Sequence, residues 1–227
     1  MRTGYTLAEA QAVLGALARL HGAFWQSPRL GAAWLPAWND PGIGALVRGA
    51  YAQVWPACRQ HFAAALPDDV AAFGDGLEAR LPTLVEELAA APVTLLHGDC
   101  RLDNVLFRDE EPDGHVGPTP VFIDWRLVAS GRPALDVAYF LTQSGDPAQL
   151  AAHEDDLLGG YHAALTDAGA DGYGFDDLAA DYRRAVAQCF VYPVLAVGSI
   201  DPGDAAQVEM AGIALARAGA AVMRVGA

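Results

Sequence analysis

Apolar residues recur at the spacing of an amphipathic helix near the start of the chain. Thr6 and Glu9 stand three residues apart just before this pattern, as the two partners of a capping box do. Together these features predict a helix that begins after Thr6 and buries one face. The apolar positions are Leu7, Ala10, Leu14, Leu17, Leu20, Phe24 and Trp25.

Helical patterns continue on both sides of the middle of the chain. After a connection rich in turn residues, they cover about residues 45–64 and 68–90. Beyond Gly131 and Pro133 the helical spacing returns. The later helical segments cover about residues 134–145, 147–168, 175–198 and 204–223.

Short apolar runs replace the helical spacing in the middle of the chain. Pro92 ends a helical run, and residues 93–96 then predict a short buried strand that stops at His97. Residues 105–107 and 121–123 are two further apolar runs, separated by acidic residues, glycines and prolines. This arrangement predicts an antiparallel hairpin.

The hairpin brings two oxygen-bearing side chains together. We expect Phe107 to lie opposite Val121, and counting back along both strands then places Asn104 opposite Asp124. Directly opposed residues have β-carbons about 4.5 to 5.5 Å apart. An amide oxygen and a carboxylate at that separation can share a hard cation such as Mg²⁺.

The loop before the hairpin carries the other candidate chemistry. Asp99 lies in a short loop close to Asn104, so its carboxylate is expected beside the same cation. There it could accept or orient the proton of a hydroxyl that attacks a phosphate, and Arg101 could stabilise the charge on that phosphate. Gly98 permits a tight backbone where a side chain would obstruct.

The element order predicts a mainly α fold with a small β insert, an α+β architecture. The chain has 227 residues, of which 53% are hydrophobic, and this is enough for a sizeable core. We find no internal repeat and no low-complexity linker.

The net charge of the chain indicates which kinds of molecule it can bind. The formal net charge is −14, and all 14 basic residues are arginine, because the sequence contains no lysine. A polyanion would be repelled, so we expect no nucleic-acid partner, whereas a cationic small molecule or a metal ion would be attracted.

The remaining composition indicates a cytoplasmic protein without a membrane partner. The three cysteines are widely separated and form no Cys-x-x-Cys pair, so neither a disulfide framework nor a thiolate zinc site is predicted. The first residues lead into polar positions rather than an unbroken apolar stretch, which argues against a secretory signal. The apolar stretch 185–200 is interrupted and shorter than the roughly 20 residues that a bilayer needs.

Several motifs carry a family resemblance. His97, Gly98 and Asp99 are followed by four residues and then Asn104, and Ile-Asp-Trp at 123–125 comes about twenty positions later. This order resembles aminoglycoside phosphotransferases and related choline-kinase-like and ecdysteroid-kinase-like small-molecule kinases. The segments 131–141 and 17–25 are also similar to those families, so the resemblance covers nearly the whole chain.

The resemblance implies a protein-kinase-like C-terminal lobe that uses ATP as phosphate donor and Mg²⁺. The implied catalytic residues are Asp99 as base, Arg101 and His97. Arg101 occupies the place of a phosphate-contacting lysine and is therefore also the implied cofactor-binding residue. The remaining implied roles are Asn104 and Asp124 as magnesium ligands, and Asp136 and Gly98, together with His97, as structural supports of the catalytic loop.

By the same resemblance, residues 1–227 form one catalytic lobe with three subregions. These are a helical part at 1–92, a catalytic and metal-binding core at 93–141, and a helical substrate-side part at 142–227. The families normally begin with a β-rich lobe that contains a phosphate-covering loop and a strand lysine. Neither is found in the sequence, so we expect that lobe to be absent and nucleotide binding and rate to suffer.

Three explanations for that departure stay open: a shortened gene model, a lobe supplied by another chain, or a non-catalytic remnant. The leading hypothesis is a phosphotransferase acting on a small-molecule hydroxyl. The alternative is a binding or interaction module that self-associates through the surface left by the missing lobe, and a metal-dependent hydrolase is a third reading. The acceptor could be an aminoglycoside, an amino alcohol, a sterol-like alcohol or a hydroxyacyl thioester.

Structural roles, rather than catalytic or binding roles, are expected for several residues outside the central motifs. His21 lies on the apolar face of the first helix, where a packed and hydrogen-bonded core histidine is expected rather than a ligand. His153 and the acidic residues after it indicate a solvated helix start. Core packing, rather than the lining of a substrate pocket, is expected for a group of aromatic residues: Trp25, Trp34, Trp38, Tyr51 and Trp55.

Overall fold

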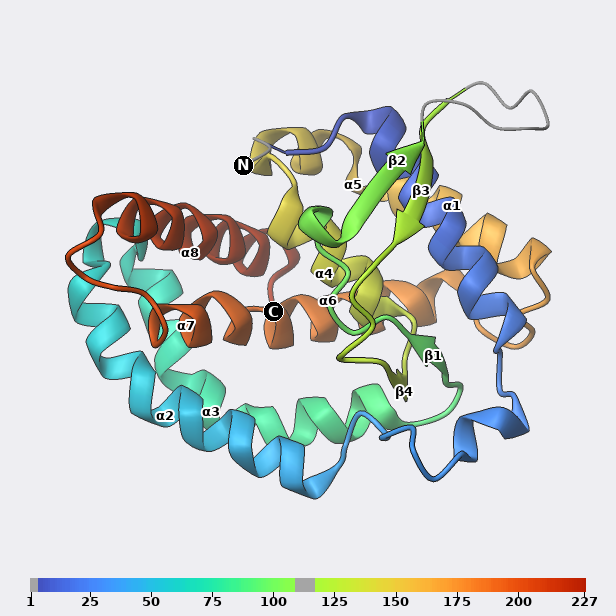
Figure 1. Ribbon diagram of the computed structural model, residues 1–227, viewed down its shortest axis with the longest axis horizontal. Coiled ribbons are helices and arrows are strands. Elements are labelled where there is room, and N and C mark those ends of the chain that lie inside the picture. Colours follow the sequence, from blue (N-terminus) through green and yellow to red (C-terminus); the bar gives the residue numbers. More distant parts are fainter. Residues whose placement is uncertain (1–3, 109–116) are drawn as a thin grey trace.

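The computed structural model describes residues 4–108 and 117–227 as a helical body with a small β region near its centre (Figure 1). The first helix, α1 (Leu7–Ala23), has the capping box that the sequence predicts, with Thr6 and Glu9 each accepting a hydrogen bond from the other's backbone N–H. Its apolar face packs along α5 (Pro147–Asp167).

Two long helices form one side of the molecule (Figure 1). α2 (Pro41–His61) begins after Asp40, whose carboxylate accepts from the backbone N–H groups of the first turn. α3 (Asp68–Ala89) packs against α2, and the Tyr51 hydroxyl of α2 donates to the backbone oxygen of Gly74 in α3 at 2.8 Å. Short 3₁₀ turns cover Pro28–Gly31, Ala63–Ala65 and Leu102–Asn104.

The second half of the chain adds four more described helices. They are α4 (Ala134–Ser144), α6 (Phe175–Cys189), α7 (Val191–Val197) and α8 (Ala205–Val225). The helices follow the predicted segments except that the helix predicted over about 175–198 is two helices. Pro193 has no N–H to donate to the oxygen of Cys189, so a continuous helix would lose that bond. The Cys189 oxygen accepts instead from the Gln143 side chain at 3.4 Å.

The strands of the described residues form two small antiparallel pairs. β1 (Thr94–Leu96) pairs with β4 (Ala129–Gly131), and β2 (Val105–Arg108) pairs with β3 (Thr119–Phe122). The hairpin between β2 and β3 is present as predicted, and most of its connection lies outside the described residues. β4 was not predicted, because its sequence Ala-Ser-Gly carries no β-branched or aromatic residue.

The predicted register of the hairpin is wrong by one residue. Leu106, not Phe107, lies opposite Val121, and the backbone N–H of Ile123 donates to the oxygen of Asn104 at 3.0 Å. The observed register turns Phe122 toward the core and leaves Ile123 37% exposed. Burying the larger aromatic ring outweighs burying the isoleucine, and a slip of one residue exchanges the two faces of a strand.

The core gathers where the apolar faces of the helices meet around α4. The residues of α4 from Ala134 to Thr142 are all buried, and the polar Asp136 is buried among them. Such a helix must satisfy its charged residue with internal hydrogen bonds. No helix among the described residues is both long enough and apolar enough to cross a membrane.

Candidate active site

The carboxylate of Asp136, in the first turn of α4, holds the loop that follows β1. The backbone N–H of His97 donates to Oδ2 at 2.7 Å, and the backbone N–H of Gly98 donates to Oδ1 at 2.9 Å. Asp136 is 1% exposed, so these charge-assisted bonds form away from water, where they are strong. One side chain therefore fixes the direction in which the loop leaves the strand.

A buried histidine supports Asp136 from behind. Nε2 of His21 in α1 lies 3.3 Å from Oδ2 of Asp136, and Nδ1 lies 2.7 Å from the Tyr161 hydroxyl of α5. The side chain of His21 is completely buried. His21 is thus the packed, hydrogen-bonded residue that its position on the apolar face predicts.

Gly98 has a conformation that other residues rarely adopt. Its φ is +80°, and a β-carbon at this position would lie 2.0 Å from the backbone oxygen of Leu127. The loop and the segment after β3 approach each other too closely for any side chain. The glycine is therefore required both by its φ and by the space around it.

The ring of His97 ties the loop to the end of β3. Nδ1 accepts from the backbone N–H of Asp99 at 3.3 Å, and Nε2 donates to the backbone oxygen of Ile123 at 2.9 Å. The ring also contacts Trp125, with centroids 4.6 Å apart. Since both nitrogens are engaged with backbone, His97 is placed to support the loop, and the proton on Nε2 follows from its carbonyl partner.

Asp99 and Asn104 contact each other directly. Nδ2 of Asn104 donates to Oδ2 of Asp99 and to the backbone oxygen of Asp99, both at 2.9 Å. The orientation of the amide is fixed, because the reverse orientation would place three oxygens together. The amide oxygen of Asn104, the atom that would bind a cation, takes no part in these bonds.

Tyr139 of α4 lies beside Asp99, and Tyr192 of α7 packs against Tyr139. Burial and the charge of Asp99 raise the pKa of Tyr139 in α4. The ring of Tyr139 contacts that of Tyr192 in α7, with centroids 4.4 Å apart. Asp99 is 9% exposed, and Tyr139 lies close enough for the charge of Asp99 to act on its hydroxyl.

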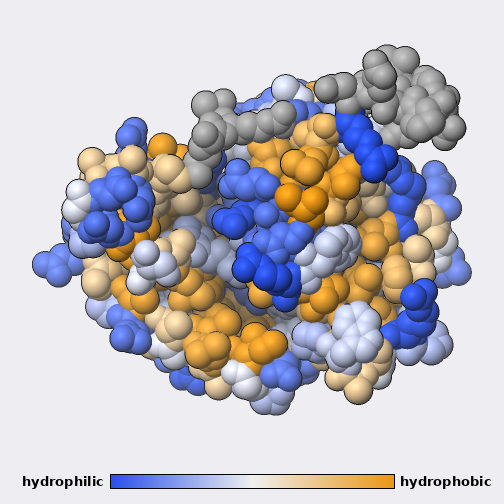
Figure 2. All heavy atoms as spheres, viewed as in Figure 1, coloured by the Kyte–Doolittle hydropathy of each residue, from blue (hydrophilic) through white to orange (hydrophobic). Residues whose placement is uncertain are grey.

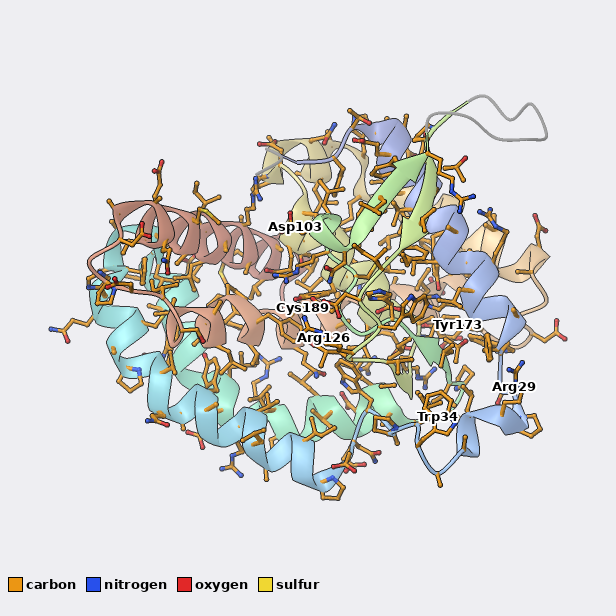
Figure 3. The ribbon with its side chains drawn as sticks, viewed as in Figure 1. Arg29, Trp34, Asp103, Arg126, Tyr173 and Cys189 are labelled. Atoms are coloured by element: carbon orange, nitrogen blue, oxygen red, sulfur yellow. The ribbon has the colours of Figure 1, made fainter. Side chains whose placement is uncertain are left out.

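Asp124 leaves the end of β3 with a backbone conformation that is unusual for a residue with a side chain. Its φ is +62°, a left-handed value that non-glycine residues seldom adopt. Both carboxylate oxygens accept from Arg126: Nε donates to Oδ1 and Nη2 to Oδ2, each at 2.6 Å. These bonds lower the pKa of Asp124. Figure 3 shows Arg126 at the centre of the view.

The charged groups of the site act on one another. Nε of Arg101 lies 3.6 Å from Oδ1 of Asp99. The positive charge of Arg101 also contributes to lowering the pKa of Asp124, and the negative charge of Asp99 contributes to raising that of Arg126. Two acids and two arginines therefore form one electrostatic group, and hydrophilic residues occupy the centre of the face shown in Figure 2.

A family model covers more than half of the chain that carries this geometry. The model of the ecdysteroid kinase-like family matches residues 40–171, which include every residue described above except His21 and those of α7. The chain belongs to the ecdysteroid kinase-like family. Its fold is accordingly that of a small-molecule kinase, as the central motifs predict.

A solved structure supports the fold of this ecdysteroid kinase-like chain. A crystal structure of a Ralstonia eutropha JMP134 protein assigned as an aminoglycoside phosphotransferase is similar, with a TM-score of 0.52 and 18% sequence identity. The similarity covers 99% of this chain and 68% of that chain. No curated protein sequence matches the chain.

The site of this ecdysteroid kinase-like protein contains two residues that the motifs did not single out. Arg126 follows the Ile-Asp-Trp run directly, and its place two residues after Asp124 was the available signal. Tyr139 lies three residues after Asp136 on α4, so both face the loop that carries Asp99. The structure brings together Asp99, Arg101, Asn104 and Asp124, with Asp136, Gly98 and His97 around the loop.

Proposed function

We propose that this chain transfers the γ-phosphate of ATP to a hydroxyl group of a small molecule. The observation that carries the proposal is the direct contact of Asp99 with Asn104 on a loop held rigidly by Asp136, with Asp124 at the end of the paired strand. Kinases of this architecture work mainly by positioning groups and by electrostatic stabilisation, and a braced loop with opposed charges supplies both.

Each residue has a distinct task in the proposed reaction. A carboxylate oxygen of Asp99 accepts the proton of the acceptor hydroxyl. The oxygen of that hydroxyl forms a bond to the γ-phosphorus as the proton leaves. The bond between that phosphorus and the bridging oxygen of ADP breaks at the same time. The Asn104 amide holds Asp99 in place, and the guanidinium of Arg101 stabilises the negative charge of the transferring phosphate.

The oxygen atoms at the site suit Mg²⁺. Asn104 offers an amide oxygen and Asp124 a carboxylate, both hard ligands of the type that Mg²⁺ prefers. Two protein ligands are enough, because Mg²⁺ keeps several waters and binds through one or two carboxylates together with substrate phosphates. When bound, the ion neutralises the charge that develops on the phosphates.

The acceptor is proposed to be a small alcohol, with a cationic group favoured. The net charge of −14 attracts cations and repels polyanions. The carboxylates outnumber the arginines over the whole chain, so the net charge does not indicate whether the acceptor is an amino alcohol, an aminoglycoside or another alcohol. Family membership alone does not identify the substrate.

Calorimetry with Mg²⁺ and ATP tests the proposal. We expect binding in the millimolar range or tighter by the wild-type chain, and loss of at least about tenfold in affinity in Asp124→Asn, because one of two protein ligands is weakened. Asp99→Asn should bind the nucleotide with nearly unchanged affinity but lose phosphate transfer, by roughly a hundredfold or more. Asp103→Asn, which removes an exposed carboxylate from the same loop, is the matched control.

A non-catalytic interaction module is the second candidate, and an exposed apolar group favours it. Leu106, Ile123, Trp125 and Leu127 lie around the charged site and are 37% to 54% exposed. Exposed apolar groups of this kind mark interaction surfaces. Absence of any heat with Mg²⁺ and ATP, together with concentration-dependent association in ultracentrifugation, would support the module and contradict the enzyme.

A further inference from the structure

The ion pair between Arg126 and Asp124 occupies the carboxylate edge that a metal ion would use. Nε and Nη2 of Arg126 take one carboxylate oxygen each, at 2.6 Å, so neither oxygen of Asp124 is open to a second cation from this side. The planar fork of a guanidinium matches a carboxylate in this way, whereas an ammonium group does not. The contact therefore occupies one edge of the Asp124 carboxylate, while each oxygen keeps a second lone pair.

The two partners of this ion pair differ in how firmly the protein holds them. Asp124 lies two residues after β3, and its side chain is 27% exposed. The side chain of Arg126 is 80% exposed, so its stem has few packing contacts to keep it in place. Rotation of that stem releases the guanidinium to water without disturbing the fold.

The charges of the site also favour release of Arg126 from Asp124 when a divalent ion binds. Arg126 neutralises Asp124, and Arg101 lies 3.6 Å from Asp99, so both acids already have a cationic neighbour within the chain. A divalent ion that binds Asp124 would lie beside the guanidinium of Arg126, and like charges at that separation repel. A divalent ion on the carboxylate edge that the guanidinium occupies displaces Arg126, and phosphate oxygens of a bound nucleotide are then partners of matching charge and geometry.

We propose that Arg126 is an internal competitor for the metal site: its guanidinium occupies Asp124 in the metal-free protein and moves to a nucleotide phosphate when a divalent ion binds. The inference rests on the proposed function. It assigns Arg126 as a nucleotide-binding residue that also weakens binding of the free metal ion. Metal and nucleotide then enter together rather than separately.

The proposal predicts opposite effects of one substitution on two ligands. Arg126→Gln removes the competitor, so free Mn²⁺, used as a paramagnetic probe for the divalent ion, should bind roughly two- to fivefold more tightly, the range that exposed ion pairs contribute. When the protein is already saturated with Mn²⁺, the same variant should bind ATP more weakly, by a similar factor, because it has lost a phosphate contact. Titrations followed by electron paramagnetic resonance and by calorimetry measure the two affinities.

Two further variants separate this contact from a general effect of charge. Arg126→Lys keeps the charge but cannot span both oxygens, so its Mn²⁺ affinity should lie between those of the wild type and Arg126→Gln. Arg48→Gln removes an equal charge from an exposed ion pair with Glu78 on α2 and α3, and both of its affinities should match the wild type. Melting curves establish that each variant is folded.

Each outcome decides between the two proposals. If Mn²⁺ binding requires Asp124 but is unchanged in Arg126→Gln, the proposed function stands and the role of Arg126 is wrong. If Arg126→Lys binds Mn²⁺ with the wild-type affinity while Arg126→Gln binds more tightly, charge alone explains the result and the two-oxygen contact is not the cause. If neither the wild type nor Arg126→Gln binds Mn²⁺, both proposals fail.

Discussion

Single residues set the shape of the loop that carries Asp99. Asp136 accepts two backbone N–H groups of the loop, and Gly98 allows the chain to turn beside the Leu127 carbonyl. The sequence motifs place these residues near the site but not their partners, because spacing along the chain does not show which backbone groups a carboxylate faces. The clamp of Arg126 on Asp124 was missed for the same reason.

Replacing Gly98 should disturb the loop strongly. Gly98→Ala introduces a β-carbon at a φ of +80° and 2.0 Å from a backbone oxygen, so we expect a free energy of unfolding lower by about 2 kcal/mol or more. Gly44→Ala is the matched control. Gly44 lies in α2 with no atom within 4 Å of the added carbon, and this change should stabilise the protein by up to about 1 kcal/mol.

Urea unfolding of both variants measures these effects. Equal stability of Gly98→Ala and the wild type would show that Gly98 does not have a left-handed φ beside the Leu127 carbonyl.

At the scale of elements, hydrophobic periodicity predicts helices well and strand pairing less well. The capping box of α1 gives its start directly, whereas the break between α6 and α7 was not predicted, although Pro193 was the signal available for it. The register of β2 and β3 depends on which apolar side chains fit the core, and this requires the packing of helices far away in the sequence. Asn104 therefore faces Ile123, although spacing predicted Asp124.

Two alanine substitutions test the register. Phe122 contacts the rings of His97 and Trp125 and packs against the core, so Phe122→Ala should lower the free energy of unfolding by about 1 to 3 kcal/mol. Ile123 is 37% exposed, so Ile123→Ala should change it by less than about 1 kcal/mol. The predicted register would reverse this order, and chemical denaturation of the two variants distinguishes them.

At the scale of the whole molecule, the core keeps several cysteine thiols and tyrosine hydroxyls protonated. Burial raises the pKa of the Cys58 thiol to about 11, and burial likewise raises the pKa values of Cys100, Cys189, Tyr51 and Tyr161. In the unfolded chain, cysteine ionises near pH 8.5 and tyrosine near pH 10, roughly. Above those values the unfolded state binds fewer protons than the folded state.

The protein should therefore lose stability as the pH rises above about 8.5. For Cys58 the contribution is fully present below the unfolded pKa and decreases by about 1.4 kcal/mol per pH unit up to its folded pKa. Melting temperatures should stay level from pH 7 to about pH 8.5 and fall from there to pH 11, and Cys58→Ser should make that fall smaller. A melting temperature that stays constant over this range would contradict the burial of these groups.

The chain of contacts from Tyr161 through His21 and Asp136 to the backbone of His97 joins α5, α1 and α4 to the catalytic loop. Substitutions in α5 beside Tyr161 should therefore also affect the position of this loop. A substitution that rotates α5 by a few degrees would move Tyr161 and, through His21, the Asp136 carboxylate. Changes of specificity and of turnover in this protein should then be hard to obtain separately.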